Sequence, residues 1–270
     1  MSAARSPHPS ALPASRETVP GAREAGDGHS QPLLEITDLD AGYGEMVVLR
    51  GIAIRIRPAE IVAMVGGNGA GKTTLLRAIS RLIPSRGNIT FDGHPLPATA
   101  DEVFALGLVQ VPEGRQLFDR MSVEENLRMG AYRRRDASAI AGDLARMYDI
   151  FPRLSDRRRQ LAGSMSGGEQ QMCAMARALM AKPRLMMVDE MSLGLAPVIV
   201  DLLLDTMARI RAEGVTVLLV EQDVHAALSV ADRGYVMETG EIVGQGTAQE
   251  LASDPEVQRA YLGDVTAGGA

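Results

Sequence analysis

Residues 66–73 of this 270-residue chain constrain its fold more than any other stretch. They read Gly-Gly-Asn-Gly-Ala-Gly-Lys-Thr, they follow the apolar run 61–65, and they precede residues 74–81, where we expect a helix. Glycines let the backbone turn several N–H groups toward one anion, and a helix start adds partial positive charge. The stretch therefore predicts a phosphate-binding loop between a strand and a helix. An ordinary glycine turn is the alternative, and the succession of strand, loop, Lys-Thr and helix argues against it.

The residues expected to bind nucleotide here are Gly66, Gly67, Asn68, Gly69, Ala70, Gly71, Lys72, Thr73 and Thr74. Lys72 would neutralise the β- and γ-phosphates of ATP, and the Thr73 hydroxyl would ligate Mg²⁺. ATP and Mg²⁺ are therefore the expected cofactors.

A pair of acids, Asp189 and Glu190, follows the apolar run 185–188 directly. Burying uncompensated charge at the end of an apolar strand is costly, and a bound cation offsets that cost. The segment resembles a Walker B motif, in which Asp189 would hold Mg²⁺ and Glu190 would polarise the water that attacks the γ-phosphate. Alone, the acid pair is also compatible with a surface turn, so its interpretation depends on the loop at 66–73.

Apolar runs and amphipathic stretches alternate along the chain, which indicates an α/β fold. The runs 61–65, 185–188 and 215–220 are predicted to be buried strands, with the ligand site beyond their carboxyl ends. Residues 122–161 are helical and charged in pattern, and the arginine runs 133–135 and 157–159 are interpreted as solvated helix faces rather than as a surface for an acidic partner.

Composition excludes several classes of protein. With 28 basic and 34 acidic residues the net charge is −6, so we expect no nucleic-acid partner. A single cysteine rules out an internal disulfide and favours a reducing compartment. We find neither an uninterrupted apolar window of membrane-spanning length nor a signal-peptide pattern.

Both ends of the chain are expected to lie outside the folded part. Residues 1–31 are rich in Pro, Ser, Ala and Gly and are predicted to be a disordered extension. Thr247 and Glu250 predict a capping box that opens a short helix, the stretch 261–263 closes the folded domain, and 264–270 form a flexible tail.

The segment 165–171, Met-Ser-Gly-Gly-Glu-Gln-Gln, is similar to the LSGGQ signature of ABC ATPases and lies between the two motifs above, as in that family. Its Ser, Gly, Gly and Glu, which are Ser166, Gly167, Gly168 and Glu169, would open a helix at 169–180 and present a second anion-binding helix start. An ordinary glycine cap is the alternative. The resemblance covers 33–262 and implies that these four residues complete the nucleotide site of a second cassette in a head-to-tail dimer.

The resemblance also implies the architecture. It is an α/β P-loop NTPase cassette at 32–263, with a RecA-like core, an antiparallel β subdomain and a helical signature subdomain at about 115–165. Tyr43 would stack on adenine with Val48 nearby, and a core tyrosine is the alternative. Glu113 lies where the family usually has its Q-loop glutamine, with a catalytic and metal-binding role. Gln222 takes the catalytic switch position that is usually a histidine.

Taken together, Val-Pro-Glu-Gly-Arg at 111–115, the signature, the stretch 192–197 and Val-Glu-Gln at 220–222 resemble the LivF-type subunit of branched-chain amino acid importers. Met191, where proline is usual, and Ala196, at the D-loop aspartate position, depart from the general pattern. Urea or short-amide importers share much of it. A soluble non-transport ABC ATPase and a regulatory protein with an inactive site remain alternatives.

The importer resemblance implies the partners and the location. The partners are a second cassette, LivG-like or a second copy, two transmembrane permease subunits and, indirectly, an extracytoplasmic substrate-binding protein. The location is the cytoplasmic face of the inner membrane. His225 and Cys173 are expected to be surface or packing residues without a catalytic role.

Overall fold

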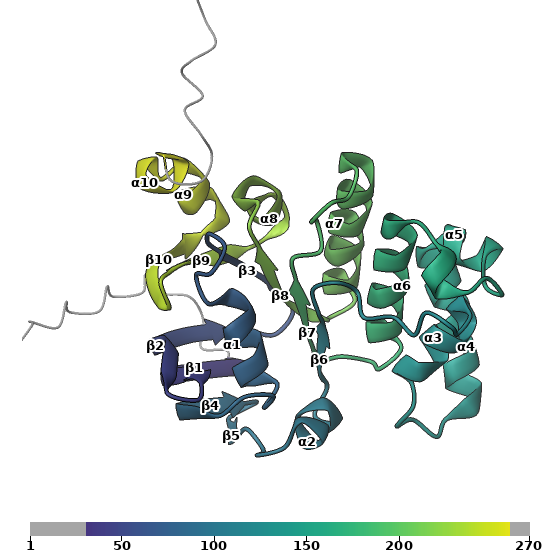
Figure 1. Ribbon diagram of the computed structural model, residues 1–270, viewed down its shortest axis with the longest axis horizontal. Coiled ribbons are helices and arrows are strands. Elements are labelled where there is room, and N and C mark those ends of the chain that lie inside the picture. Colours follow the sequence, from purple (N-terminus) through teal and green to yellow (C-terminus); the bar gives the residue numbers. More distant parts are fainter. Residues whose placement is uncertain (1–30, 260–270) are drawn as a thin grey trace, which may run out of the picture. The chain divides into compact units, whose positions relative to one another are not determined.

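The computed structural model describes residues 31–259. The expectations for residues 1–30, for the closing stretch 261–263 and for the tail 264–270 lie outside the described residues. Within them, two sheets and a set of helices form the fold, and the expected α/β class is confirmed (Figure 1).

The larger sheet has six strands in the order β10-β9-β3-β8-β7-β6. Their bounds are β10 Glu241–Thr247, β9 Arg233–Glu238, β3 Ile61–Val65, β8 Thr216–Glu221, β7 Leu185–Asp189 and β6 Leu108–Val111. The strands from β9 to β6 run parallel, and β10 is antiparallel to β9. Every residue of β3, β7 and β8 is buried, as expected for parallel strands covered on both faces.

The smaller sheet is antiparallel, with four strands in the order β2-β1-β4-β5. Their bounds are β2 Met46–Ile56, β1 Leu34–Tyr43, β4 Ser85–Phe91 and β5 His94–Pro95. Figure 1 shows this sheet and α1 (Lys72–Ile79) on one side of the larger sheet, with α7 (Pro197–Ala212) and α8 (Val224–Val230) on the other. Successive side chains of β3 point to opposite faces of the larger sheet, so this strand contributes to both hydrophobic cores. Val62 and Met64 belong to the core shared with β1 and β2, whereas Ala63 belongs to the core under α7 and α8.

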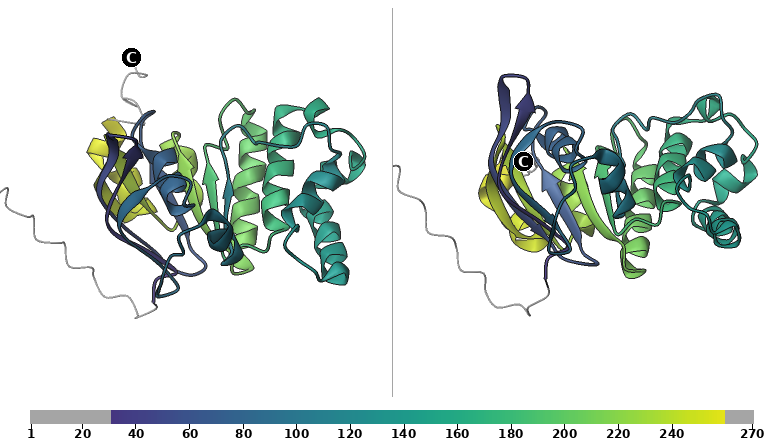
Figure 2. Two further views of the ribbon diagram at one scale, coloured as in Figure 1. Left: turned by 60° about the horizontal axis from the view of Figure 1, so that its bottom comes forward. Right: turned by 90° about the horizontal axis from the view of Figure 1, so that it is seen from below.

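The remaining helices include those of the charged region predicted to be helical. Their bounds are α2 Ala100–Ala105, α3 Val123–Gly130, α4 Ala137–Ile150, α5 Pro152–Asp156, a 3₁₀ turn at Ala162–Ser164, α6 Gly167–Leu179, α9 Ala248–Ser253 and α10 Pro255–Val257. Both views in Figure 2 place the teal helices α3 to α5 at the opposite end from the purple strands β1 and β2. The capping box of Thr247 and Glu250 is confirmed at the start of α9.

Some expected boundaries were wrong. The helix predicted over 74–81 is α1, which begins at Lys72 and ends before Arg81, because Arg81 adopts a left-handed φ of 56°. The helix predicted over 169–180 begins two residues earlier, at Gly167, because Ser166 is the capping residue.

The interpretation of the arginine runs as solvated faces was also wrong in part. Arg134 is mostly buried and its Nη2 lies 2.9 Å from Asp136 and 2.6 Å from Asp143. Arg157 pairs with Glu169. Asp143 lies on α4 and Glu169 on α6, outside the arginine runs, so a pattern of charges along the chain does not reveal these pairs.

Candidate functional site

The glycine-rich loop connects β3 to α1 and wraps around the ammonium group of Lys72. Lys72 is 4% exposed, and its Nζ donates to the carbonyl oxygens of Gly66 at 2.8 Å and Gly67 at 3.1 Å. Gly71, at φ 110°, caps α1, and the first turn of that helix has no acidic residue. The helix start therefore offers its free N–H groups and partial positive charge without a competing carboxylate.

Two contacts fix the shape of this loop. A Cβ on Gly66 would lie 2.2 Å from the carbonyl oxygen of Met237, so no larger residue fits where β9 passes. Gly240 donates its N–H to the Ala70 carbonyl at 2.8 Å, which ties the loop to the turn between β9 and β10. Asn68 and Gly69 are exposed at the crown of the loop, where a phosphate would have access.

The acid pair at the end of β7 lies against this loop. The hydroxyl of Thr73 donates to Asp189 Oδ1 at 3.3 Å, and Glu190 Oε1 lies 3.2 Å from Lys72 Nζ. Glu190 has a left-handed φ of 44°, and its N–H donates to the Val220 carbonyl of β8 at 2.9 Å. The fold thus brings together the lysine, hydroxyl and carboxylates that the two motifs predicted.

Asp189 is the most strongly perturbed of these acids. It is 1% exposed, and its Oδ2 has no hydrogen-bond partner. Burial raises its pKa to about 6; the Thr73 hydrogen bond opposes this, and the charges of Glu190 and Glu113 reinforce it. A buried carboxylate oxygen without a partner, beside a threonine hydroxyl, fits an oxygen-ligated divalent cation.

The protein side chains at this site would supply only some of the ligands of such a cation. Within residues 31–259 no group of three or more His, Cys, Asp or Glu side chains is placed to hold a metal. Magnesium bound with a nucleotide takes only one or two protein ligands, because phosphates and waters supply the rest. Thr73 and Asp189 meet that requirement.

Glu113 and Gln222 approach the site from neighbouring loops. Glu113 follows β6 and is exposed, and its charge acts on Asp189. Gln222 follows β8 directly and is exposed as well. Both therefore extend from the carboxyl ends of strands on the sheet edge that carries the phosphate loop.

Glu221, next to Gln222, is a residue that sequence reasoning missed. It is 1% exposed, and it accepts hydrogen bonds from the Ser192 N–H at 3.1 Å and from its hydroxyl at 2.7 Å. Burial raises its pKa. The signal in the sequence was an acid directly after the apolar run 215–220. In the structure, the hydrogen bonds of Glu221 link the segment after β7 to the end of β8.

The residues expected around adenine lie at the ends of β1 and β2. Tyr43 is 38% exposed, so the alternative of a core tyrosine is wrong. Its hydroxyl accepts from Arg77 Nη1 at 2.9 Å and lies 3.5 Å from the Thr74 hydroxyl. Val48 is half-buried on the adjoining strand. The partly exposed ring thus lies beside α1, with the Arg77 guanidinium 5.9 Å from its centroid.

The signature residues form a second helix start. Glu169 Oε2 accepts from the Ser166 N–H at 3.0 Å and from its hydroxyl at 2.9 Å, and Ser166 Oγ accepts from the Glu169 N–H at 3.4 Å. A Cβ on Gly168 would lie 3.0 Å from the Ile199 side chain, and one on Gly167 would meet the Arg115 guanidinium at 3.0 Å. In the part of the chain described here, no hydrogen bond or ion pair joins 166–169 to 66–73.

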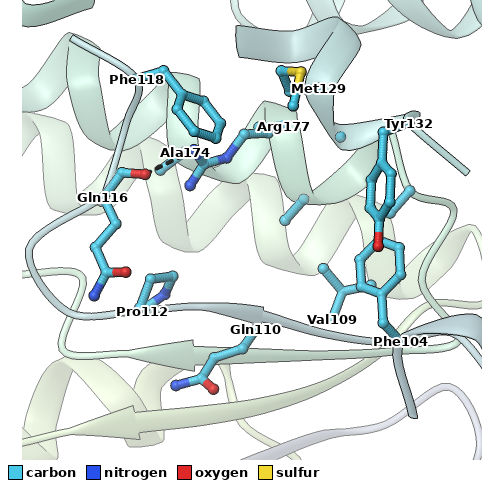
Figure 3. Close-up of a pocket in the computed structure, with 13 residues that line it drawn as sticks. Phe104, Val109, Gln110, Pro112, Gln116, Phe118, Met129, Tyr132, Ala174 and Arg177 are labelled. Atoms are coloured by element: carbon cyan, nitrogen blue, oxygen red, sulfur yellow. Dashed lines mark hydrogen bonds between the residues drawn. The ribbon is translucent and has the colours of Figure 1, made fainter. Parts of the chain in front are cut away.

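Arg177 of α6 holds the loop that carries Glu113. Its Nη1 donates to the Gln116 carbonyl at 2.8 Å (Figure 3). Its Nη2 donates to the Arg115 carbonyl at 3.2 Å. Both of these loop residues have left-handed φ values, 44° for Gln116 and 65° for Arg115. Sequence reasoning missed Arg177, because only the folded chain brings it 61 residues back to this loop.

A cavity of about 410 Å³ lies beside this loop. Figure 3 shows Phe118 and Arg177 on one side of it, Phe104 and Tyr132 on the other, and Gln116 near the loop. The rings of Phe104 and Tyr132 stack with centroids 5.5 Å apart.

The two residues set aside from catalysis lie away from these contacts. Cys173 is buried in α6, and burial raises its pKa to about 12, which keeps the thiol protonated. His225 is exposed on α8.

A parallel sheet with a lysine-bearing phosphate loop, an acid pair on a neighbouring strand and a separate Ser-Gly-Gly helix start defines a P-loop nucleotide hydrolase of the cassette class. The family model described as ABC transporter matches residues 49–192, and the chain belongs to the ABC transporter ATPase family. The expected fold class and ATP-hydrolase class are thereby confirmed, and the chain is an ATP-binding, ATP-hydrolysing subunit of an ABC transporter.

Several relatives share nearly their whole length with this chain. The high-affinity branched-chain amino acid transport ATP-binding protein BraG of Pseudomonas aeruginosa is 42% identical, over 86% of this chain and 100% of BraG. The probable branched-chain amino acid transport ATP-binding protein LivF of Archaeoglobus fulgidus is 34% identical, over 86% of this chain and 100% of LivF. The resemblance to LivF-type cassettes is confirmed by these matches.

Solved structures agree. An ATP-binding subunit of an ABC transporter is 29% identical with a TM-score of 0.73, covering 85% of this chain and 96% of that chain. The ADP conformation of MJ1267, an ATP-binding cassette of an ABC transporter, has a TM-score of 0.75 at 25% identity, covering 87% of this chain and 100% of that chain. Among residues 31–259, no helix combines the length and apolar character needed to cross a bilayer.

Proposed function

We propose that this cassette powers the uptake of branched-chain or related amino acids through partner permeases. The observation that carries this proposal is the 42% identity with BraG over the whole of that protein. Specificity for cargo resides in other subunits, so relatives that share a cassette sequence this closely are the best available guide to it. Urea or short amides are the second candidate cargo, on the resemblance of the motifs alone.

The chain's own residues divide the work of hydrolysis. Lys72 and the N–H groups of 66–73 bind and orient the β- and γ-phosphates of ATP, while Tyr43 and Val48 receive the adenine. Glu190 accepts a hydrogen bond from the attacking water and polarises it. Gln222 and Glu113, which lie beyond neighbouring strands, orient groups around the γ-phosphate, where Gln222 supplies a neutral amide.

Mg²⁺ belongs to this proposal through the residues that would hold it. Thr73 and Asp189 would hold the ion, with Glu113 at the edge of the same site. When bound, it offsets the negative charge of the phosphate oxygens. The unpaired Oδ2 of Asp189 supports this assignment, because a buried carboxylate oxygen without a donor is costly unless a ligand satisfies it.

The signature residues serve a second cassette in this proposal. Ser166, Gly167, Gly168 and Glu169 form a helix start that makes no hydrogen bond to the chain's own phosphate loop among the described residues. A head-to-tail pair of cassettes places that helix start opposite the partner's phosphate loop. The partner is a LivG-like cassette or a second copy of this chain.

The permeases would contact the region from Glu113 to Asn126, beside the cavity described above. Phe118, 47% exposed, and Tyr132, 59% exposed, both line that cavity, and apolar side chains exposed together are typical of protein–protein contact sites. This contact would hold the cassette at the cytoplasmic face of the inner membrane, with the extracytoplasmic binding protein engaged indirectly.

Reconstitution with the permeases and binding protein tests the function. We expect ATP-dependent uptake of labelled leucine, competed by isoleucine and valine. Uptake of labelled urea with no uptake of leucine would replace the proposed cargo by the second candidate. ATP turnover without uptake of any solute, by a complex of proven composition, would refute the transport role.

The composite site has a separate test with a matched control. Ser166→Ala and Ser122→Ala each remove a serine from a capping box, on α6 and α3 respectively. Each should cost about 1 kcal/mol of stability. Only Ser166→Ala should weaken ATP-dependent pairing of cassettes that carry Glu190→Gln, by at least about tenfold. Equal effects of the two changes would refute the shared site.

A further inference from the structure

Arg157 makes a contact that neither the motifs nor the arginine run predicted. Its Nε lies 2.7 Å from Glu169 Oε1, and its Nη1 donates to Gln160 Oε1 at 3.1 Å. The side chain of Glu169 is only 8% exposed, whereas that of Arg157 is 43% exposed. The guanidinium therefore covers a nearly buried carboxylate from the solvent side.

The negative charge of Glu169 is unfavourable for binding a phosphate at this helix start. It lies in the first turn of α6, within the helix start that the proposed composite site offers to the triphosphate of a second cassette. A carboxylate favours a helix N-terminus when the helix is considered alone, but it repels a phosphate brought to the same N–H groups. Without a counter-charge, Glu169 would oppose the binding that Ser166 and the two glycines favour.

Each oxygen of this carboxylate has its own partner. Oε2 accepts from the N–H and hydroxyl of Ser166, and Oε1 faces Arg157. Burial by itself would raise the pKa of Glu169, but the hydrogen bonds from Ser166 and the charge of Arg157 together lower it. Glu169 is therefore ionised at neutral pH, and among the described residues it forms an ion pair with Arg157, whereas the nearby Arg115 guanidinium donates to Gln170.

We propose that Arg157 is a positioning residue of the composite nucleotide site, which neutralises Glu169 so that the Ser166 helix start can accept the triphosphate bound by a second cassette. This inference rests on the proposed head-to-tail site. It assigns a role to one arginine of the run 157–159 and none to its neighbours.

The backbone around Arg157 is held independently of its side chain. The N–H groups of Val123 and Glu124 donate to the carbonyls of Gln160 and Arg158, both at 3.0 Å, and Ser122 bridges to Leu161. Replacing the guanidinium therefore leaves this segment anchored to the start of α3. Arg157→Gln is expected to fold, and Arg159→Gln, at an exposed position two residues away, is the matched control.

The test is a double-mutant comparison in the assembled transporter, with ATP hydrolysis measured against ATP concentration. Arg157→Gln should raise the KM for ATP at least about fivefold, and Arg159→Gln should leave it unchanged. In a Glu169→Gln background, adding Arg157→Gln should change KM less than about twofold, because no charge remains to be balanced. Binding of a fluorescent ATP analogue to the isolated full-length chain should be the same for wild type and Arg157→Gln.

Two outcomes would overturn the inference: an unchanged KM in Arg157→Gln, or an equal increase with and without Glu169. Thermal unfolding of each variant separates these from a loss of folded protein. If Ser166→Ala raises KM and Arg157→Gln does not, only the role of Arg157 fails. If neither changes KM while Lys72→Ala abolishes hydrolysis, the composite site itself fails.

Discussion

Lys72 Nζ lies 3.2 Å from Glu190 Oε1, so the predicted phosphate-binding cation and the predicted catalytic carboxylate form an ion pair. The side chains are 3% and 13% exposed, which places the pair largely out of water. Lys72 also donates to two loop carbonyls, and its three donors are thereby satisfied. A triphosphate at this loop would compete with Glu190 for the ammonium, leaving the carboxylate available to water.

Lys72→Ala should abolish nucleotide-dependent transport while the fold is retained. Losing the cation that neutralises the β- and γ-phosphates should lower ATP hydrolysis by about 10²–10³-fold, a loss typical of removing one preorganised donor. Uptake and hydrolysis measure the effect, and circular dichroism measures the fold. Lys182→Ala, which removes an exposed lysine paired with Asp143, is the control and should retain activity. Normal uptake by Lys72→Ala would contradict the assignment of this loop.

Glu190→Gln should separate ATP binding from hydrolysis. The amide keeps the shape of the side chain but cannot accept a proton, so single-turnover hydrolysis should fall by about 10²–10⁴-fold. Filter binding of labelled ATP should be retained, and cassette pairs should accumulate. Turnover at the wild-type rate would show that another group activates the water.

Gly66→Ala and Gly67→Ala, adjacent in the loop, should differ sharply in stability. The added methyl at 66 would meet the Met237 carbonyl at 2.2 Å, whereas at 67 no atom lies within 4 Å. Urea unfolding should show a loss of about 2 kcal/mol or more for Gly66→Ala, typical of overpacking against backbone. For Gly67→Ala the change should stay within about 0.5 kcal/mol. Comparable losses in both would mean that the approach of β9 does not select glycine at 66.

Asp189 should give the nucleotide-free protein a characteristic pH dependence. Its pKa is raised from 3.8 to about 6, so between these values the folded chain holds a proton that the unfolded chain has lost. The free energy of unfolding therefore falls as pH rises through this window, by at most about 3 kcal/mol. Asp189→Asn removes the titrating group.

The measurement is the difference in urea unfolding between wild type and Asp189→Asn, in EDTA, at several pH values from 4 to 7.5. Taking the difference cancels the contributions of the other carboxyl groups. The stability of Asp189→Asn relative to wild type should rise across the window and level off above it. A difference independent of pH would contradict the raised pKa.

Arg177→Ala should release the loop that carries Glu113. It removes two charge-assisted hydrogen bonds to carbonyls of residues with left-handed φ, as well as a contact 5.6 Å from the Phe118 ring centroid. We expect a loss of about 2 kcal/mol in unfolding free energy and faster hydrogen exchange at 113–118. Arg209→Ala, an exposed arginine near Glu213, should cost under about 0.5 kcal/mol. Unchanged hydrogen exchange at 113–118 in Arg177→Ala would show that this loop keeps its conformation without the Arg177 side chain.

The sequence by itself determined the local features of this protein. Strand β3 was predicted at its observed bounds, and the helix start of α9 was predicted from Thr247 and Glu250, because apolar runs and caps act over a few residues. The phosphate loop was predicted for the same reason, since its glycines, Lys-Thr and helix start are adjacent in the chain, and the acid pair was interpreted through that loop.

Only the tertiary structure decided which partners the charged side chains contact. Arg157 with Glu169, Arg177 with the loop after β6, and Glu221 with Ser192 are contacts between side chains and segments of different elements. The raised pKa of Asp189 likewise follows from burial beneath neighbouring elements. Spacing along a chain carries the periodicity of one helix or strand, whereas the pairing and desolvation of distant side chains exist only once those elements have packed.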